Sequence, residues 1–514
     1  MNRVLAFVLV AVAVVVTGCT TLPPPRDRVE TTALTDTAGT RLGRAIAPSV
    51  AANPGKTGIH ALPDPRDAFA ARVLLAGAAE KSLDAQYFIW NGDHVGYLMF
   101  QALWQAAERG VRVRLLLDDM NTKGLDPTIA TLDAHPNIEV RLYNPMVSRD
   151  HRGLNFMTDF TRVNRRMHNK SFTADNQATV VGGRNIADEY FGAGAGITFA
   201  DLDLLAVGLA VPEVSKEFDV YWNSASAYSA SGFVGPSTPE GIANLDAKFV
   251  ANRADPESIA YLEAVRATPL VRELLDRKLA LEWGAAELVY DDPIKTLDTA
   301  QRTDVLLFPK LVLMIGPAEK TLDIVSPYFV PGVGGTEQLA ALAKRGVVVR
   351  ILTNSLAASD EKSVQSGYGK RRRELLQAGV QLYEIKPTAA KQSLESDNRF
   401  GSGSSSGLHA KTLAVDSRRI FVGSFNFDQR SARLNTEMGL VLSNPVLAQG
   451  LTRFFDVEVP MLAYEVRLAA DGNSLEWIER TASGEKHYDT EPETDWSTRM
   501  GVELLSILPI EWLL

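Results

Sequence analysis

The chain has a single cysteine among its 514 residues, so no disulfide can form within it. One cysteine also excludes the usual zinc sites built from several Cys and His ligands, and we expect neither a metal nor another cofactor. Basic residues are not in excess: 53 Lys and Arg against 62 Asp and Glu leave a formal net charge of −9. That balance argues against nucleic acid as a partner. Hydrophobic residues make up 46% of the chain, which is ample for about three domains or two large similar ones.

Long apolar runs are also missing, except for one at the N-terminus. Residues 4–16 follow Arg3 and are all apolar, but the run is shorter than the about 20 residues that a membrane-spanning helix needs. A basic start followed by a short apolar core is typical of a secretory signal peptide. The run ends in Val16-Thr17-Gly18-Cys19, which resembles a bacterial lipobox.

We therefore predict that residues 1–19 are a signal peptide with a lipobox and that Cys19 carries a lipid anchor. Residues 20–60 contain several Pro and Thr and are expected to form a tether. The protein would then be a lipoprotein of the bacterial envelope that faces the periplasm. Thr20, where an Asp would favour the inner membrane, favours the outer membrane. A cleaved signal peptide with a buried cysteine is the alternative.

The chain repeats itself after about 240 residues, in the same order and with similar spacing. Each copy alternates segments of helical and strand-like apolar spacing, which predicts sheets covered by helices. The expected helices are 67–81, 96–109 and 337–344, the expected strands are 83–90, 112–117 and 347–353, and a helix over 260–283 has no counterpart in either copy. The recurring segments are Ser82-Leu83-Asp84 with Thr321-Leu322-Asp323, 109–115 with 345–351, and 140–143 with 380–383.

One motif recurs at matched positions of the two copies: a His, a Lys two residues later, an Asp five after that, and an Asn ten after the Asp. Because the chain has only seven His, two such spacings inside a repeat are not coincidental. The motif residues are His168, Lys170, Asp175 and Asn185 in the first copy and His409, Lys411, Asp416 and Asn426 in the second.

These residue types suit a phosphodiester. His-x-Lys on a strand places both side chains on one face, and two such faces would surround one phosphoryl group. The Lys would neutralise its oxygens and the Asn would donate hydrogen bonds. One His would attack phosphorus and the other would transfer protons. We assign the motif Asp residues to the catalytic set, although local structure explains them better than chemistry does.

Two histidines in different roles need carboxylate partners that set their protonation. Asp201-Leu202-Asp203 aligns with Asn435-Thr436-Glu437 ahead of matching apolar strands. We therefore expect Asp203 and Glu437 to orient the histidines. Arg165-Arg166, just before His168, are expected to contact phosphate or an anionic headgroup. Arg371 to Arg373 are expected to form a solvated helix face, and the Ser-rich loop 401–407 is expected to gate the site.

The paired motifs resemble those of the phospholipase D superfamily, over about residues 60–460. Runs such as 164–172, Gly182-Gly183-Arg184-Asn185 and the C-terminal 508–514 are similar to the bacterial cardiolipin synthase C group. The resemblance implies two pseudo-symmetric α/β/α sandwich domains with the active site at their interface. The expected units are a first phospholipase D-like domain over 61–225, a helical connector over 226–300, a second such domain over 301–460, and a C-terminal extension over 461–514.

The same resemblance implies a metal-free site in which His168 is the nucleophile and His409 the general acid and base. Gly183 and Ser424 would bind phosphate together with the two Asn, although Gly183 offers no hydroxyl.

The expected function is a phosphatidyltransferase that makes cardiolipin from phosphatidylglycerol and a second phospholipid, phosphatidylglycerol or phosphatidylethanolamine, through a phosphohistidine. A hydrolase releasing phosphatidic acid, a nuclease and a non-enzymatic envelope protein are the alternatives. The expected partners are phospholipids, the membrane through a lipid anchor, and a small helper protein; one chain holds both motifs and suffices for the site.

Overall fold

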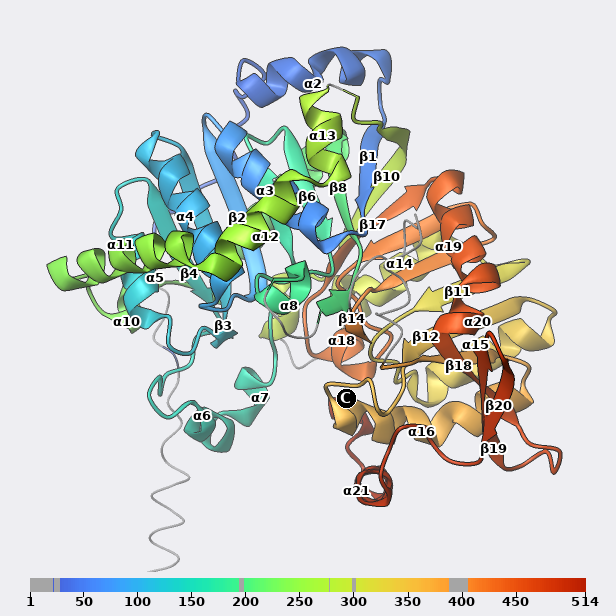
Figure 1. The fold of residues 1–514 in the computed structure, drawn as a ribbon. Helices are drawn as coiled ribbons and strands as arrows, with labels where there is room; N and C mark the ends of the chain where they lie inside the picture. The colour runs from blue at the N-terminus through green and yellow to red at the C-terminus, as the bar shows by residue number, and fades with distance from the viewer. Residues whose placement is uncertain (1–21, 23–27, 194–197, 277, 298–301, 388–404) are drawn as a thin grey trace, which may run out of the picture.

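The computed structural model describes residues 22, 28–193, 198–276, 278–297, 302–387 and 405–514 (Figure 1). Cys19, the apolar run 4–16 and most of the Ser-rich loop lie outside the described residues. Among the helices that the structure describes, none is both long and apolar enough to cross a bilayer.

The described strands include 18 that form one continuous sheet, which passes through both halves of the chain. In the first half the order is β9-β4-β3-β2-β5-β6-β8-β1, with β2, β3 and β4 parallel and the other pairs antiparallel. These strands are β1 (Thr57–Leu62), β2 (Ser82–Ile89), β3 (Arg112–Asn121), β4 (Ile138–Tyr143), β5 (Ser171–Ala174), β6 (Ala178–Gly182), β8 (Asp203–Gly208) and β9 (Ala227–Ser229).

The second half has the same strand order when both halves are followed outward from the edge they share. In the second half this order is β10-β17-β16-β15-β11-β12-β13-β18, and β19 and β20 extend it. β1 pairs with β10, so the two halves meet at equivalent strands. The strands are β10 (Glu282–Tyr290), β11 (Thr321–Val325), β12 (Val348–Asn354), β13 (Gln381–Ile385), β15 (Thr412–Val415), β16 (Arg419–Gly423), β17 (Met438–Ser443), β18 (Ala463–Leu468), β19 (Leu475–Thr481) and β20 (Gly484–Tyr488).

Helices cover the sheet on both faces (Figure 1). In the first half they are α2 (Arg41–Ala52), α3 (Pro65–Ala78), α4 (His94–Glu108), α5 (Asp126–Asp133), α6 (Arg152–Thr158), α7 (Phe160–Val163), α8 (Asp188–Phe191) and α9 (Ala210–Trp222). In the second half they are α14 (Leu307–Ile315), α15 (Gly332–Lys344), α16 (Lys362–Gln377), α18 (Gln429–Arg433), α19 (Pro445–Val457), α20 (Val459–Leu462) and α21 (Trp496–Ile507), with 3₁₀ turns η1 (Pro293–Thr296), η2 (Thr303–Val305) and η4 (Glu511–Leu513).

The local sequence explains why the two halves are built alike. A helix runs into a parallel strand through Arg109-Gly110-Val111 in the first half and through the same three residue types at 345–347 in the second. Gly110 and Gly346 adopt φ of 88° and 90° at this turn, a conformation that residues with a Cβ rarely adopt. The predicted α/β sandwich halves are therefore confirmed.

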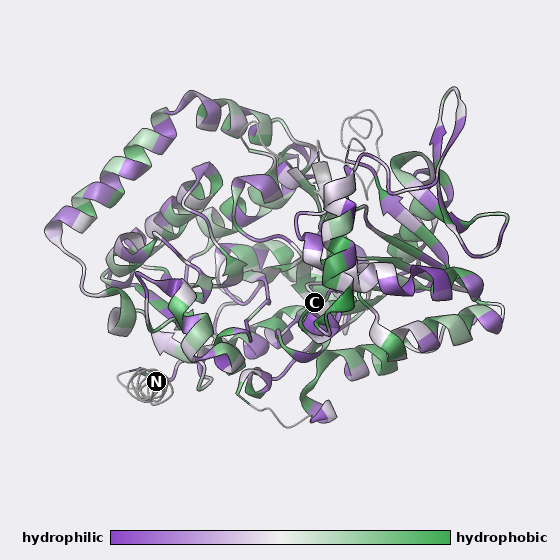
Figure 2. Ribbon diagram, turned by 90° about the horizontal axis from the view of Figure 1, so that it is seen from below, coloured by the Kyte–Doolittle hydropathy of each residue, from purple (hydrophilic) through white to green (hydrophobic). Residues whose placement is uncertain are grey.

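The interface between the halves is itself a core. One apolar cluster joins Val181 and Leu204 of the first half to Ile420 and Val422 of the second. Most helices carry both hydrophilic and hydrophobic residues along their length (Figure 2). Because the halves share buried apolar surface, they behave as one body whose interface can hold catalytic groups in fixed positions.

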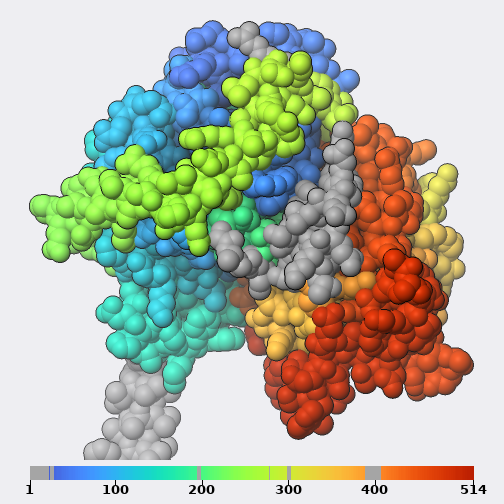
Figure 3. Space-filling view, viewed as in Figure 1, coloured from blue at the N-terminus to red at the C-terminus, as the bar shows by residue number. Residues whose placement is uncertain are grey.

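The region between the two copies differs from the prediction. The expected helix over 260–283 is two shorter helices, α12 (Pro256–Arg266) and α13 (Pro269–Leu275), after which Trp283 lies in β10. β10 pairs with β17 as β1 pairs with β8, so this strand is the counterpart of β1. Together with α10 (Ser231–Val234) and α11 (Pro239–Ala254), α12 and α13 run across the first half (Figure 3).

Candidate functional site

The two motif segments face one another where the halves meet. Each histidine is held by the backbone of the opposite half: His168 N donates to the carbonyl of Thr436 at 2.8 Å, and His409 N to that of Ala200 at 2.7 Å. A short parallel pair of β7 (Thr198–Ala200) and β14 (Ser405–Leu408) crosses the interface beside His409. The His and Lys precede β5 and β15 rather than lying on them as expected.

A carboxyl group from the opposite half contacts each histidine. Nδ1 of His168 lies 2.8 Å from Oε2 of Glu437, and Nδ1 of His409 lies 2.6 Å from Oδ2 of Asp201. All four side chains are buried. With Nδ1 donating to the carboxyl group, the lone pair of Nε2 is left for chemistry in each ring.

The assignment of Asp203 as a histidine partner was wrong. Its carboxylate accepts a hydrogen bond from Arg72 at 2.8 Å. The sheet register explains the error, because Gly182 pairs with Asp203 whereas Gly423 pairs with Gly439. Asp203 therefore corresponds to Gly439, and Asp201 corresponds to Glu437, two residues away from the alignment read from the sequence.

Both lysines of the motifs reach back toward the histidines. Nζ of Lys170 donates to the carbonyl of His168 at 2.6 Å, and Nζ of Lys411 donates to that of His409. Burial lowers the pKa of Lys170 to about 7 and the pKa of Lys411 to about 8. A phosphodiester bound between them would restore their charges, since an anion stabilises the protonated amine.

The two histidines are held neutral. Burial lowers the pKa of His168 well below its usual value, and the charges of Lys170, Lys411 and Arg430 lower it further. Burial and Lys411 lower the pKa of His409 to about 4, although the neighbouring Asp201 opposes the shift. A neutral imidazole is the form that can attack phosphorus.

The two carboxyl groups differ. Burial alone would raise the pKa of Asp201, but His409 and Lys411 outweigh it and lower that pKa to about 2. Burial raises the pKa of Glu437 to about 7 despite Lys170 and the hydrogen bonds that its carboxyl group accepts from Ser424 and Ser431. Asp201 is thus ionised at neutral pH, whereas Glu437 titrates near neutral pH.

The residues expected to bind phosphate have different surroundings. Oδ1 of Asn185 accepts from the backbone of Ile89 at 3.1 Å. Oδ1 of Asn426 and Nδ2 of Asn185 are buried with no hydrogen-bond partner among the described residues; of these two atoms, Nδ2 of Asn185 is the one that can donate to a phosphoryl oxygen. Oγ of Ser424 donates to Glu437 at 2.5 Å, and a Cβ on Gly183 would lie 2.2 Å from Oδ1 of Asp201.

The motif aspartates are structural, which corrects their place in the catalytic set. Asp175 and Asp416 lie at the far ends of β5 and β15 from the histidines, with φ of 51° and 52°. Each carboxylate accepts hydrogen bonds from three successive backbone amides at the start of a parallel strand. These amides belong to Glu80, Lys81 and Ser82 for Asp175, and to Glu319, Lys320 and Thr321 for Asp416.

Comparisons with known proteins agree with this geometry. A family model described as "Cardiolipin synthase, PLD-like domain" matches residues 74–203 and 311–458, together more than half of the chain. The chain belongs to this family. It is 45% identical to cardiolipin synthase C of Escherichia coli, over 92% of this chain and all of that one. It is 25% identical to the major cardiolipin synthase of Bacillus subtilis, over 77% of this chain and 68% of the other.

A solved structure shares the fold. The phosphatidylserine synthase of Haemophilus influenzae matches with a TM-score of 0.54 at 13% identity, covering 92% of this chain and all of that chain. Its strands and helices therefore follow the same arrangement as this member of the cardiolipin synthase family.

Several arginines that were expected to face solvent or to bind phosphate instead contact other groups of the protein. Arg166 is buried and pairs with Asp118 at 2.9 Å, and Arg165 donates to the carbonyl of Lys295 at 2.7 Å. Arg372, expected to be solvated, is buried and pairs with Glu384. Buried ionic groups of this kind position the backbone instead of binding ligands.

Arg430 is a site residue that the sequence analysis missed. It lies in α18, four residues after Asn426, and donates to Oδ1 of Asn164 at 2.9 Å. Its charge lowers the pKa of His168. Its backbone N–H also donates to the carbonyl of the C-terminal Leu514 at 2.8 Å. No recurring motif marks Arg430, because the first half has Glu189 at the equivalent position.

Proposed function

We propose that the protein makes cardiolipin by transferring a phosphatidyl group between two phospholipids through a phosphohistidine on His168. Membership of the cardiolipin synthase family supports the reaction class. The observation that carries the mechanism is the crossed pair of contacts, His168 with Glu437 and His409 with Asp201.

In the first step, Nε2 of His168 attacks phosphorus of the donor phospholipid. Because His409 is neutral in the unliganded site, its Nε2 must first take up a proton as the anionic lipid binds. The P–N bond then forms as the bond from phosphorus to the headgroup oxygen breaks, and Nε2 of His409 gives this proton to that oxygen. Asp201 favours this role for His409, because an ionised carboxylate stabilises the imidazolium that must supply the proton. Lys170, Lys411 and Asn426 would hold the phosphoryl oxygens.

In the second step, the terminal hydroxyl of phosphatidylglycerol replaces the departed headgroup. His409 takes the proton of this hydroxyl, its oxygen attacks phosphorus, and the P–N bond to His168 breaks. Cardiolipin leaves, and His409 is again protonated for the next cycle. Glycerol is the other product if phosphatidylglycerol is the donor, and ethanolamine if phosphatidylethanolamine is.

The same machinery would release phosphatidic acid if water attacked instead. Aromatic rings crowd the two histidines: Phe88 lies 5.0 Å from His168, and Tyr190 and Phe199 lie 5.0 and 5.5 Å from His409, between ring centroids. Apolar walls of this kind exclude water and favour an alcohol carried on a lipid.

The N-terminal segment supports a membrane lipoprotein. A lipid on Cys19 would hold the site at the bilayer where its substrates lie, on the periplasmic side and with the outer membrane favoured. A Cys19→Ala variant should lose lipid modification, seen as a mass change, and should leave the membrane fraction. One chain supplies every group of the proposed reaction, while a helper protein would act outside these steps.

Lipid product analysis tests the proposal. Vesicles of phosphatidylglycerol, with and without phosphatidylethanolamine, are incubated with the protein and with a His168→Ala control, and mass spectrometry follows cardiolipin and phosphatidic acid. We expect cardiolipin that depends on His168. Phosphatidic acid without cardiolipin would mean that the protein is a hydrolase and not a transferase.

A further inference from the structure

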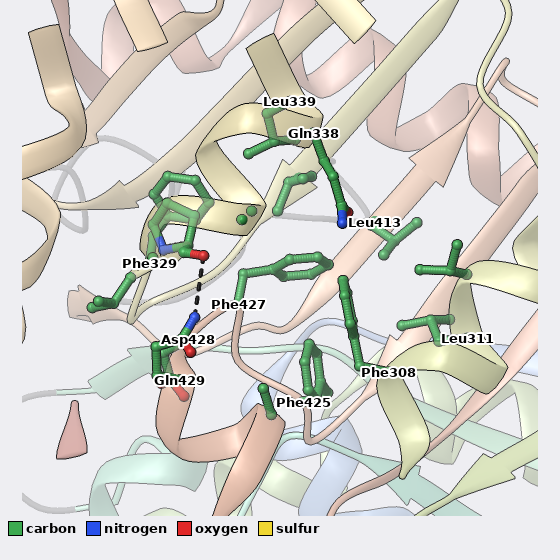
Figure 4. Close-up of a pocket in the computed structure, with 18 of the residues that line it drawn as sticks. Phe308, Leu311, Phe329, Gln338, Leu339, Leu413, Phe425, Phe427, Asp428 and Gln429 are labelled. Carbon is green, nitrogen blue, oxygen red and sulfur yellow. Dashed lines mark hydrogen bonds between the residues drawn. The ribbon is translucent and has the colours of Figure 1, made fainter. Parts of the chain in front are cut away.

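A large apolar cavity lies in the second half, between the sheet and the helices α14 and α15. Its volume is about 680 Å³, within the range of small-molecule sites. Figure 4 shows Phe308, Leu311, Leu339 and Phe427 directed toward this space, and Leu413 closes it from the sheet. Polar groups such as Gln338 and Gln429 lie among the lining residues.

At the equivalent place in the first half, larger side chains stand at several positions where the cavity wall has smaller ones. The bridge between Trp90 and Ile186 repeats as one between Phe329 and Phe427. Trp90 stacks on Phe100 with centroids 4.6 Å apart. At two further equivalent positions the first half has a larger residue than the cavity wall has. The pairs are Met99 with Gly335, and Phe191 with Ala432.

The covering of the two places differs as well. In the first half, α12 and α13 pack on α3, and Tyr261 of α12 lies 5.4 Å from Phe69. In the second half the cavity has apolar, exposed lining residues: Val312 is 51% exposed and Val333 57%. An unfilled apolar space with exposed apolar lining residues is expected to take an apolar ligand.

The cavity shares a wall with the catalytic site. Phe425 and Phe427 line the cavity, and Asn426 between them belongs to the phosphate-binding motif. Along an extended segment, alternate side chains point to opposite sides. A phosphate at Asn426 would therefore lie on one side of this segment and the cavity on the other, a separation that a long acyl chain can span.

We infer that the cavity holds one fatty acyl chain of a phospholipid substrate. This inference rests on the proposed function and names where the lipid binds. The glycines of α15 and Ala432 leave room that the first half fills with Met99 and Phe191, so the same residue types placed in the second half should displace the chain.

Cross-linking with phosphatidylglycerol that carries a diazirine near the end of one acyl chain tests the inference. Peptide mass spectrometry should locate the adducts on α14 and α15, around Leu339. Gly335→Met and Ala432→Phe should each reduce these adducts at least fivefold. Gly77→Met is the matched control, because Gly77 is an exposed helical glycine of the first half with nothing within 4 Å of an added Cβ.

Kinetics separate this inference from the proposed function. The filling variants should raise KM for long-chain phosphatidylglycerol about tenfold and leave turnover of six-carbon-chain lipid unchanged. Adducts confined to other segments, or adducts that persist in both filling variants, would overturn the acyl site. If adducts form in the cavity but the protein makes no cardiolipin, the acyl site would stand and the proposed reaction would be overturned.

Discussion

The half-site around His168 and the half-site around His409 differ in the carboxyl group that each histidine contacts. Asp201 beside His409 has a pKa of about 2, whereas Glu437 beside His168 has a pKa of about 7. Ser424 donates to Glu437, and its counterpart, Gly183, has no side chain at all. Two halves with one fold thus give two histidines different electrostatic surroundings.

This difference supports the proposed roles of the two histidines, which the repeat itself leaves equal. A permanent carboxylate stabilises an imidazolium and suits the histidine that carries a proton. A histidine beside a carboxyl group that is half protonated near pH 7, and surrounded by cationic groups, stays neutral and suits nucleophilic attack. The predictions below test whether His168 and His409 differ in this way.

The largest effect is expected from replacing either histidine by Asn. Both His168→Asn and His409→Asn should reduce cardiolipin formation by about 10⁴-fold or more. With a p-nitrophenyl phosphatidyl ester, whose leaving group needs no proton, the variants should separate. His409→Asn should release p-nitrophenol in a burst and accumulate phosphoenzyme, measured by stopped-flow absorbance and intact-protein mass. A burst from His168→Asn instead would reverse the assigned roles.

The next effects on turnover are expected from replacing the carboxyl groups that contact the histidines. Asp201→Asn should reduce turnover about 10³-fold, because His409 loses the charge that stabilises its imidazolium. Glu437→Gln should cost less, about tenfold near neutral pH, since Glu437 is partly protonated there. Rate against pH is the diagnostic measurement. Activity should fall above pH 7, because ionised Glu437 repels the anionic substrate, and this fall should weaken in Glu437→Gln.

Asp203→Asn is the control for these substitutions. Asp203 is buried and pairs with Arg72 rather than with a histidine, so we expect a loss of about 3 kcal/mol of stability and near-normal turnover by the folded fraction. If Asp203→Asn slowed chemistry as Asp201→Asn does, the crossed pairing would be wrong.

Exchanging the small residues should have a smaller effect. In Gly183→Ser the new Cβ would lie 2.2 Å from Oδ1 of Asp201, so the carboxylate must move and turnover should fall about 10²-fold. Ser424→Gly removes one hydrogen bond to Glu437 and should cost less than tenfold. Steady-state kinetics on both variants, with thermal melts to verify folding, measure the difference. Equal losses would show that the half-sites tolerate the same residue.

Much of this site was predictable from the sequence, because the repeat and the motif spacing mark it. His168, Lys170, His409 and Lys411 meet at the interface as expected, and each follows from a pattern present twice. Glu437 was also found, since it precedes a strand that recurs. Asp201 was missed because the sequence alignment paired Asp203 with Glu437. In the sheet register, Asp203 is equivalent to Gly439 instead, and Asp201 to Glu437.

The residues that could not be predicted are those in which the halves diverge. The partner of Asp203 is Arg72, which is part of the extra packing of the first half and has Leu311 at its equivalent position. Trp283 was placed in a helix because its strand follows two helices without a turn signal. Arg430 has no counterpart in the repeat. The repeat in the sequence predicts the site residues that both halves have. It does not predict a function or a contact that only one half has.

The last prediction concerns the affinity for an anion and its dependence on pH. Lys170 and Lys411 have pKa values of about 7 and 8 in the unliganded site, and a bound phosphodiester requires them protonated. Below pH 7 both charges are in place, and above pH 8 binding must take up protons. The affinity for dibutyl phosphate, whose single charge does not titrate in this range, should therefore fall at least tenfold from pH 6.5 to 8.5.

Calorimetry in buffers of different ionisation enthalpy should detect this proton uptake. Ionisation of Glu437, with its pKa of about 7, repels the anion and acts in the same direction. Because Glu437 belongs to the His168 half-site, Glu437→Gln should remove part of the pH dependence while Lys411 keeps the rest. An affinity that stays constant from pH 6.5 to 8.5 would mean that the lysines are fully charged before the lipid arrives, and the electrostatic difference between the half-sites would then rest on the carboxyl groups alone.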